Sequence, residues 1–245
     1  MFAMQLGLSQ YRVLLLIALL GCCCAAMAAG KPPETPEEMH REIIANMPLV
    51  EGKLADYVDQ VGQRIVRHSD QAGDSFTFTV IDNPDINAFA LPDGYVYIHR
   101  GLIGYLNSEA QLAAVLAHEI GHVTARHSAE RYSTAQATNL GLMVLGVLGS
   151  AAGVPSGVGQ LVSFGAQAAL QSYSREQELE ADRLGVRYLT RAGYSPQAMT
   201  SFFTKMQAHA ELEKAMAGDK EDATHNIMST HPRTAERIDQ AIDLE

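Results

Sequence analysis

Residues 108–122 read SEAQLAAVLAHEIGH, and this stretch decides how the surrounding chain is interpreted. Its apolar residues recur at helical spacing, and Ser108 followed three residues later by Gln is typical of a helix N-terminus. The pattern predicts one long helix from Ser108 to about Arg131. His118 and His122 are four residues apart on it, so their azimuths differ by only about 40° and both imidazoles lie on one face.

This histidine spacing is suited to a zinc ion. Two imidazole nitrogens on one helical face can chelate a single tetrahedral metal. Glu119 points about 100° away from His118, a position from which a carboxylate reaches a water at the metal without ligating the metal. A solvated helix face that happens to carry two histidines is the alternative interpretation.

A catalytic zinc site needs a third protein ligand. The metzincin pattern does not supply it, because Ala125 and Ser128 stand where that pattern has glycine and histidine. On a continuous helix, His127 lies about 140° around the axis from His122 and cannot reach the same ion. We therefore expect a carboxylate from another helix to complete the site.

Ser174 starts a second helix, which carries four acidic residues: Glu176, Glu178, Glu180 and Asp182. Glu178 and Asp182 share one face, so Glu178 can bind the metal while Asp182 accepts the distal N–H of a histidine ligand. Glu176 and Glu180 form a competing pair on a different face. Spacing alone leaves both pairs open, as well as a solvated acidic face.

The remaining segments predict an α+β fold that is mainly α. Alternating apolar residues over 76–80, a short strand over 87–90 and another over 95–98 predict a small antiparallel sheet of three strands. Further helices are expected after Thr35, over about 49–68, from Ser195 and from Pro232.

Residues 1–28 predict a signal peptide and therefore export. The apolar run from Val13 to Leu20 has the length of a secretory h-region and is too short to span a membrane. Leu19-Leu20-Gly21-Cys22 resembles a lipobox, which would leave Cys22 lipidated, whereas Ala26-Met27-Ala28 resembles an ordinary cleavage site. Both endings stay open, together with an uncleaved anchor. The 3 cysteines are consecutive from Cys22, so the chain after residue 30 has no disulfide or thiolate metal site.

Residues 31–245 are expected to form a single domain. No residue from Tyr132 to Ser174 is charged, and this segment predicts two apolar helices joined by a Gly/Pro turn at 153–157. A core helical hairpin and a lid or membrane-touching hairpin both remain open. A net charge of -10 without a basic stripe excludes nucleic-acid binding.

The chain contains four motifs in a fixed order: Asn87-Ala88-Phe89-Ala90-x-Pro92-x-Gly94 with Gly101-Leu102, His118-Glu119-x-x-His122, Ser174-Arg175-x-x-Glu178-x-x-Ala181-Asp182, and Ser229-Thr230-His231-Pro232 with Arg237-Ile238. Together these motifs resemble the gluzincin family of HtpX and the CAAX prenyl proteases. The resemblance extends over about residues 40–243. Within the family, the chain resembles the soluble, exported branch typified by BepA and LoiP. One departure is Asp93, where the family more often has Gly.

The resemblance implies a metalloendopeptidase with one zinc ion on His118, His122 and Glu178. Glu119 would act as general base and acid. Asn87 and His231 would lie near the oxyanion or cap the metal in a resting form.

The resemblance also implies polypeptide substrates, in particular misfolded or stalled envelope proteins, and a role in protein quality control. The enzyme would work in the periplasm of a Gram-negative bacterium, with a lipidated Cys22 or the 132–174 hairpin as its contact with the outer membrane. Substrate would lie as an added strand along a sheet edge, for which the 95–98 strand is the candidate. The alternative function is a zinc-stabilised chaperone or client-binding module with little turnover, in which the general base would have no use.

Overall fold

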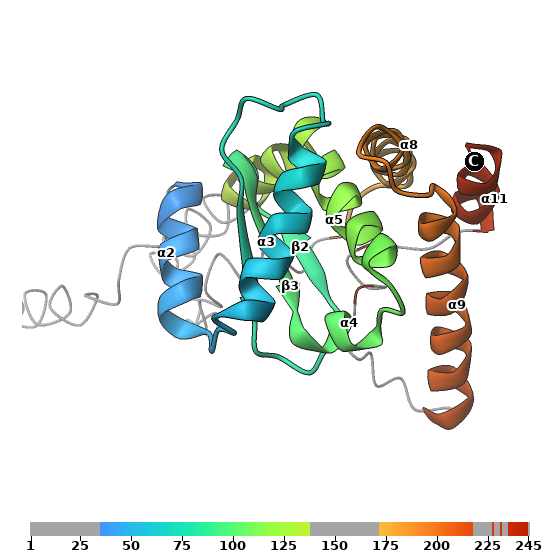
Figure 1. Ribbon diagram of the computed structural model, residues 1–245. Helices are drawn as coiled ribbons and strands as arrows, with labels where there is room; N and C mark the ends of the chain where they lie inside the picture. The colour runs from blue at the N-terminus through green and yellow to red at the C-terminus, as the bar shows by residue number, and fades with distance from the viewer. Residues whose placement is uncertain (1–34, 138–171, 218–226, 228–230, 232–234, 245) are drawn as a thin grey trace, which may run out of the picture. The chain divides into compact units, whose positions relative to one another are not determined.

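The structure is a computed structural model that describes residues 35–137, 172–217, 227, 231 and 235–244 (Figure 1). The predicted signal peptide with Cys22, and residues 138–171 of the predicted hairpin, lie outside the described residues. In the part of the chain that is described, no helix is both long and apolar enough to cross a membrane. The described residues include the helices α2 (Pro36–Asn46), α3 (Lys53–Val66), α4 (Arg100–Tyr105), α5 (Glu109–Thr124), α8 (Arg175–Arg191), α9 (Gln197–Ala217) and α11 (Ala235–Asp243), and a further helical stretch over 127–137.

The sheet has three strands, β1 (Thr77–Ile81), β2 (Ala88–Ala90) and β3 (Tyr95–His99), in the order β1-β3-β2. β2 and β3 form an antiparallel hairpin around the 3-10 turn η1 (Pro92–Gly94), but β1 pairs with β3 in parallel. The predicted all-antiparallel sheet is therefore wrong for this pair. The prediction assumed that consecutive strands are neighbours, whereas the loop after β1 takes β2 to the far side of β3.

This strand order also corrects the predicted substrate edge. β3 is the central strand, and both of its sides are paired. The outer side of β1 carries the segment before α3, since the Val50 N–H donates to the Val80 carbonyl at 2.9 Å. Among the described residues, the sheet edge without a neighbouring strand is therefore β2, whose three residues are buried.

Each face of the sheet packs against helices. Residues such as Val80 and Ile98 join the main core with α3 and α5. Phe89 and Tyr97 face the other way and pack with the buried Met39 of α2. Burial of each such side chain contributes about 1.5–3 kcal/mol, which explains why these short strands are stable.

α5 is the central helix, because it contacts α3, α8, α9 and the sheet (Figure 1). Two glycines let α5 and α8 approach closely. A Cβ on Gly121 would lie 2.9 Å from the Ala181 carbonyl oxygen, and a Cβ on Gly185 would lie 3.3 Å from the backbone nitrogen of His118. The chain thus brings the histidine helix and the acidic helix together at the positions that carry the predicted ligands.

Helix termini follow the predicted signals in most places. Thr35 and Ser174 form complete capping boxes, and Gly193 takes a positive φ after α8. The predicted continuous helix from Ser108 to Arg131 is wrong, however. α5 ends at Thr124, Arg126 adopts a φ of 64°, and residues 127–137 are helical again.

Candidate metal centre

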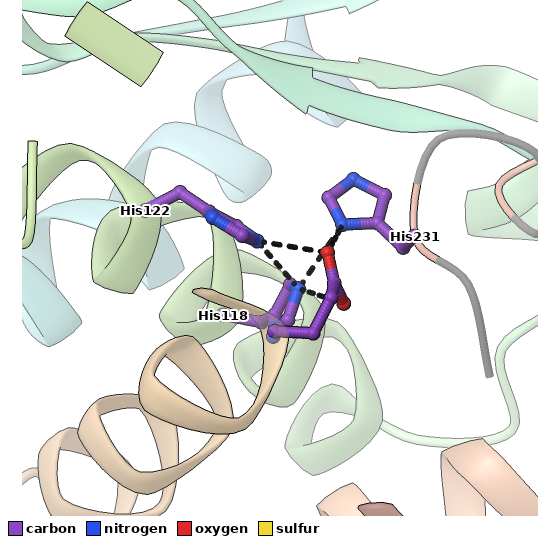
Figure 2. Close-up of side chains that lie close together, drawn as sticks. His118, His122 and His231 are labelled. Atoms are coloured by element: carbon purple, nitrogen blue, oxygen red, sulfur yellow. Dashed lines mark hydrogen bonds and ion pairs between the residues drawn. The ribbon is translucent and has the colours of Figure 1, made fainter. Parts of the chain in front are cut away.

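Four side chains from three parts of the chain converge at the crossing of α5 and α8. His118 and His122 come from α5, Glu178 from α8, and His231 from the segment before α11. Each offers one ligand atom, and these atoms lie within 4.8 Å of one another. All four residues are buried, and Figure 2 shows the three imidazoles pointing toward one another.

The spacing of these atoms is that of a tetrahedral metal site. His118 Nε2 lies 3.0 Å from His122 Nε2 and 3.2 Å from His231 Nδ1. The Oε1 atom of Glu178 lies 3.4 Å from His122 Nε2 and 2.9 Å from His231 Nδ1. A tetrahedral ion with bonds of about 2.0–2.1 Å places its ligand atoms about 3.3–3.4 Å apart. The four residues therefore fit a divalent metal of borderline character, for which imidazole and carboxylate are the preferred ligands.

The charges around the centre favour a cation in its middle. Burial alone would raise the pKa of Glu178, but His231, His118 and His122 hold this pKa well below its ordinary value. Burial would lower the pKa of His118, but Asp182 and Glu178 outweigh it and raise the pKa to about 9. The lowered pKa keeps Glu178 ionised, and burial lowers the pKa of His122 well below its ordinary value, which keeps that imidazole neutral. An ionised carboxylate and a neutral imidazole are the forms that bind a metal ion.

Glu119 lies beside this group without belonging to it. Its side chain is 0% exposed, and neither carboxylate oxygen accepts a hydrogen bond from the described residues. Oε1 lies 3.4 Å from His231 Nε2, and Glu119 lines a cavity together with His118 and His231. A buried carboxylate without hydrogen bonds is costly, so its retention beside a metal-type cluster points to a chemical task.

A second layer of contacts orients the histidines. Asp182 Oδ1 lies 2.8 Å from His118 Nδ1, which is the arrangement that the spacing of α8 predicted. Arg237 of α11 donates to both oxygens of Asp182, at 2.6 and 2.7 Å, and its Nη1 pairs with Glu178 Oε2. Arg237 stood in a sequence motif without an assigned role. The fold is needed to recognise the role of Arg237, because 55 residues separate Arg237 from Asp182 in the sequence.

The competing acidic pair does not join the cluster. Glu176 is exposed in the first turn of α8. Glu180 approaches His127 Nε2 at 3.3 Å. His127 Nδ1 lies 3.1 Å from His122 Nδ1, on the side of the ring away from Nε2. His127 is therefore outside the ligand group, as expected, although the helix break at Arg126 places it beside the ring of His122.

Asn87, the residue predicted to lie near the oxyanion or the metal, stands at the base of the β2–β3 hairpin. It directly precedes β2, and its backbone carbonyl accepts the His99 N–H at 2.9 Å. Its Oδ1 is buried and has no hydrogen-bond partner in the described parts of the chain. Sequence reasoning missed Tyr173, which stacks on His122 with ring centroids 3.6 Å apart. No periodic pattern could identify that residue.

A helix-borne histidine pair, a carboxylate from a second helix and an adjacent buried glutamate define the class of protein, which is a gluzincin-type metallopeptidase domain. Residues 53–245 match the model of Peptidase family M48, and the chain belongs to this family.

Curated relatives agree with this assignment. The chain is 34% identical over 224 residues to the beta-barrel assembly-enhancing protease of Escherichia coli O157:H7, which covers 88% of this chain and 44% of that protein. It is 36% identical over 210 residues to the protein of the same name from Yersinia pestis, covering 82% and 41%. It is 33% identical over 183 residues to mitochondrial metalloendopeptidase OMA1 of Schizosaccharomyces pombe, covering 74% and 50%. The chain thus spans half or less of the length of these relatives.

Proposed function

We propose that this chain is a zinc metalloendopeptidase that hydrolyses peptide bonds of misfolded or stalled envelope proteins. The observation that carries the proposal is Glu119, a fully buried carboxylate that accepts no hydrogen bond from the described residues and lies beside four converging metal-type donors. A purely structural metal site would have no use for this group.

We assign one zinc ion to His118, His122 and Glu178, with His231 as a fourth donor that leaves when substrate enters. A bound zinc ion would acidify a water molecule and polarise the substrate carbonyl. Glu119 accepts the proton of the attacking water and later gives it to the departing nitrogen. Asp182 holds His118 in the required tautomer. His231 and Asn87 are the candidates for donors to the carbonyl oxygen.

Substrate backbone pairs with the edge of β2. In the antiparallel hairpin, the Asn87 carbonyl accepts a hydrogen bond from β3. Because hydrogen-bonded residues alternate along a strand, the backbone N–H and C=O groups of Ala88 and Ala90 point away from β3. Ala88 is buried and faces no further strand among the described residues, so substrate pairing there needs the covering segments to move, while the Ala90 carbonyl accepts from Arg131 at 3.1 Å. Pairing through backbone atoms gives little sequence preference, which suits clearance of unfolded chains.

The envelope as the place of action is supported by the predicted signal peptide and by the relatives named as enhancing beta-barrel assembly. We therefore place the protein in the periplasm, with Cys22 as the outer-membrane anchor where it is lipidated. The 132–174 hairpin is a second candidate contact with the membrane or with clients.

Casein cleavage by the zinc-loaded protein and by Glu119→Gln tests the proposal. We expect cleavage to be lost in the variant while zinc content and client binding stay at the wild-type level. Equal behaviour of the two proteins, with clients bound and not cleaved, would instead support the client-binding module. Glu176→Gln is the matched control, because this exposed glutamate in the first turn of α8 lies outside the donor group.

A further inference from the structure

Tyr173 lies in a stack of three side chains beside the metal centre. One face of its ring covers His122, with centroids 3.6 Å apart and planes inclined by 15°. The guanidinium of Arg131 covers the ring at 4.0 Å and also donates to the Ala90 carbonyl at the end of β2. Tyr173 therefore stands between a predicted metal ligand and the sheet edge on which we place the substrate.

The hydroxyl group of Tyr173 is unusual for a buried tyrosine. The residue is 3% exposed, and its hydroxyl has no hydrogen-bond partner among the described residues. Buried tyrosine hydroxyls usually find a partner, and an unmade hydrogen bond costs about 1–3 kcal/mol. Stacking on His122 and Arg131 needs only the ring, which phenylalanine would supply without this cost.

The ring of Tyr173 lies beside two of the four donor residues of the metal centre, His122 and His231. Burial raises the pKa of Tyr173, Arg131 opposes the rise, and the carboxylates of Glu119 and Glu178 add to it. The ring centroid of Tyr173 lies 5.3 Å from that of His231, which belongs to the segment before α11.

We propose that Tyr173 is a further catalytic residue, whose hydroxyl donates a hydrogen bond to the oxygen of the scissile carbonyl as that oxygen becomes negative. The proposal rests on the proposed peptidase function.

In the reaction, the water oxygen bonds to the carbonyl carbon and the carbonyl π pair moves onto its oxygen. Glu119 takes the water proton, and the C–N bond then breaks as the amine leaves with that proton. Tyr173 stabilises the oxyanion throughout and transfers no proton.

Tyr173→Phe removes the hydroxyl and keeps the stack, so it tests the proposal directly. We expect kcat for peptide cleavage to fall about 100-fold with unchanged zinc content. Affinity for a phosphinic peptide, whose oxyanion mimics the tetrahedral species, should fall at least about tenfold by calorimetry. Tyr188→Phe is the matched control on α8, because its hydroxyl bonds to Thr124 away from the four donors.

The outcomes separate this proposal from the proposed function. Wild-type kcat and wild-type phosphinic peptide affinity in Tyr173→Phe would overturn the role of the hydroxyl while leaving the peptidase intact. Zinc loss in Tyr173→Phe, equal to that in Tyr173→Leu, would also overturn it and make Tyr173 a support for His122. A third outcome is that the wild-type protein cuts no polypeptide but binds the phosphinic peptide more tightly than Tyr173→Phe does. This result would refute the peptidase function and support the Tyr173 hydroxyl as a hydrogen-bond donor.

Discussion

Arg237 donates two hydrogen bonds, of 2.6 and 2.7 Å, to the carboxylate of Asp182, and both side chains are buried. This pair fastens α11 to α8 behind the donor group. The same guanidinium also pairs with Glu178, so one cation contacts two buried carboxylates. Arg237→Leu should therefore reduce the free energy of unfolding by about 3–5 kcal/mol, because it leaves buried charges unpaired.

Urea denaturation measures this loss. Arg183→Gln provides the matched control, since Arg183 also links α8 to α11 by bonding Gln240, but at the surface. We expect that variant to change stability by no more than about 1 kcal/mol. Equal effects of the two variants would mean that the buried cation has no special role.

Removing the carboxylate behind His118 should weaken the metal site without abolishing it. Asp182 lies 2.8 Å from His118 Nδ1, so Asp182→Asn should lower zinc affinity about 10- to 100-fold through a less well oriented ligand. Competition with a chromophoric chelator gives the affinity. Unaltered affinity would show that Asp182 does not act on the metal site.

The close crossing of α5 and α8 predicts sensitivity at Gly121. A Cβ there would lie 2.9 Å from the Ala181 carbonyl oxygen and 3.2 Å from its Cα, so Gly121→Ala must push the two ligand-bearing helices apart. We expect a loss of about 1–3 kcal/mol in stability together with reduced cleavage. Gly104→Ala is the control, because nothing lies within 4 Å of that position, and it should be neutral or slightly stabilising.

His231 is expected to restrain the resting enzyme. Its Nδ1 lies among the donors, and its Nε2 lies 3.4 Å from Glu119, so the ring occupies the space that the attacking water needs. His231→Ala should therefore lower zinc affinity, keep one zinc per chain and raise the initial rate of casein cleavage. A fall in rate at full zinc occupancy would instead identify His231 as an oxyanion donor.

Local patterns predicted the parts of this site that lie on single helices. The four-residue spacings of His118/His122 and Glu178/Asp182 translate directly into shared helix faces, and the structure places these residues together. Relations between distant segments were not predictable in this way. The parallel pairing of β1 with β3 depends on the path of the loop after β1, which crosses to the far side of β3. The hydrogen bonds between Arg237 and Asp182 depend on how α11 packs against α8. The break at Arg126 followed no glycine or proline signal.

The central claim is that one zinc ion sits between α5 and α8, and anomalous scattering at the zinc edge from crystals of the purified protein tests it most directly. The account predicts one zinc per chain, bound at about 2.0–2.2 Å by Nε2 of His118, Nε2 of His122 and a carboxylate oxygen of Glu178. A zinc ion held by Glu176 or Glu180, or a chain in which these three residues hold no zinc, would contradict it.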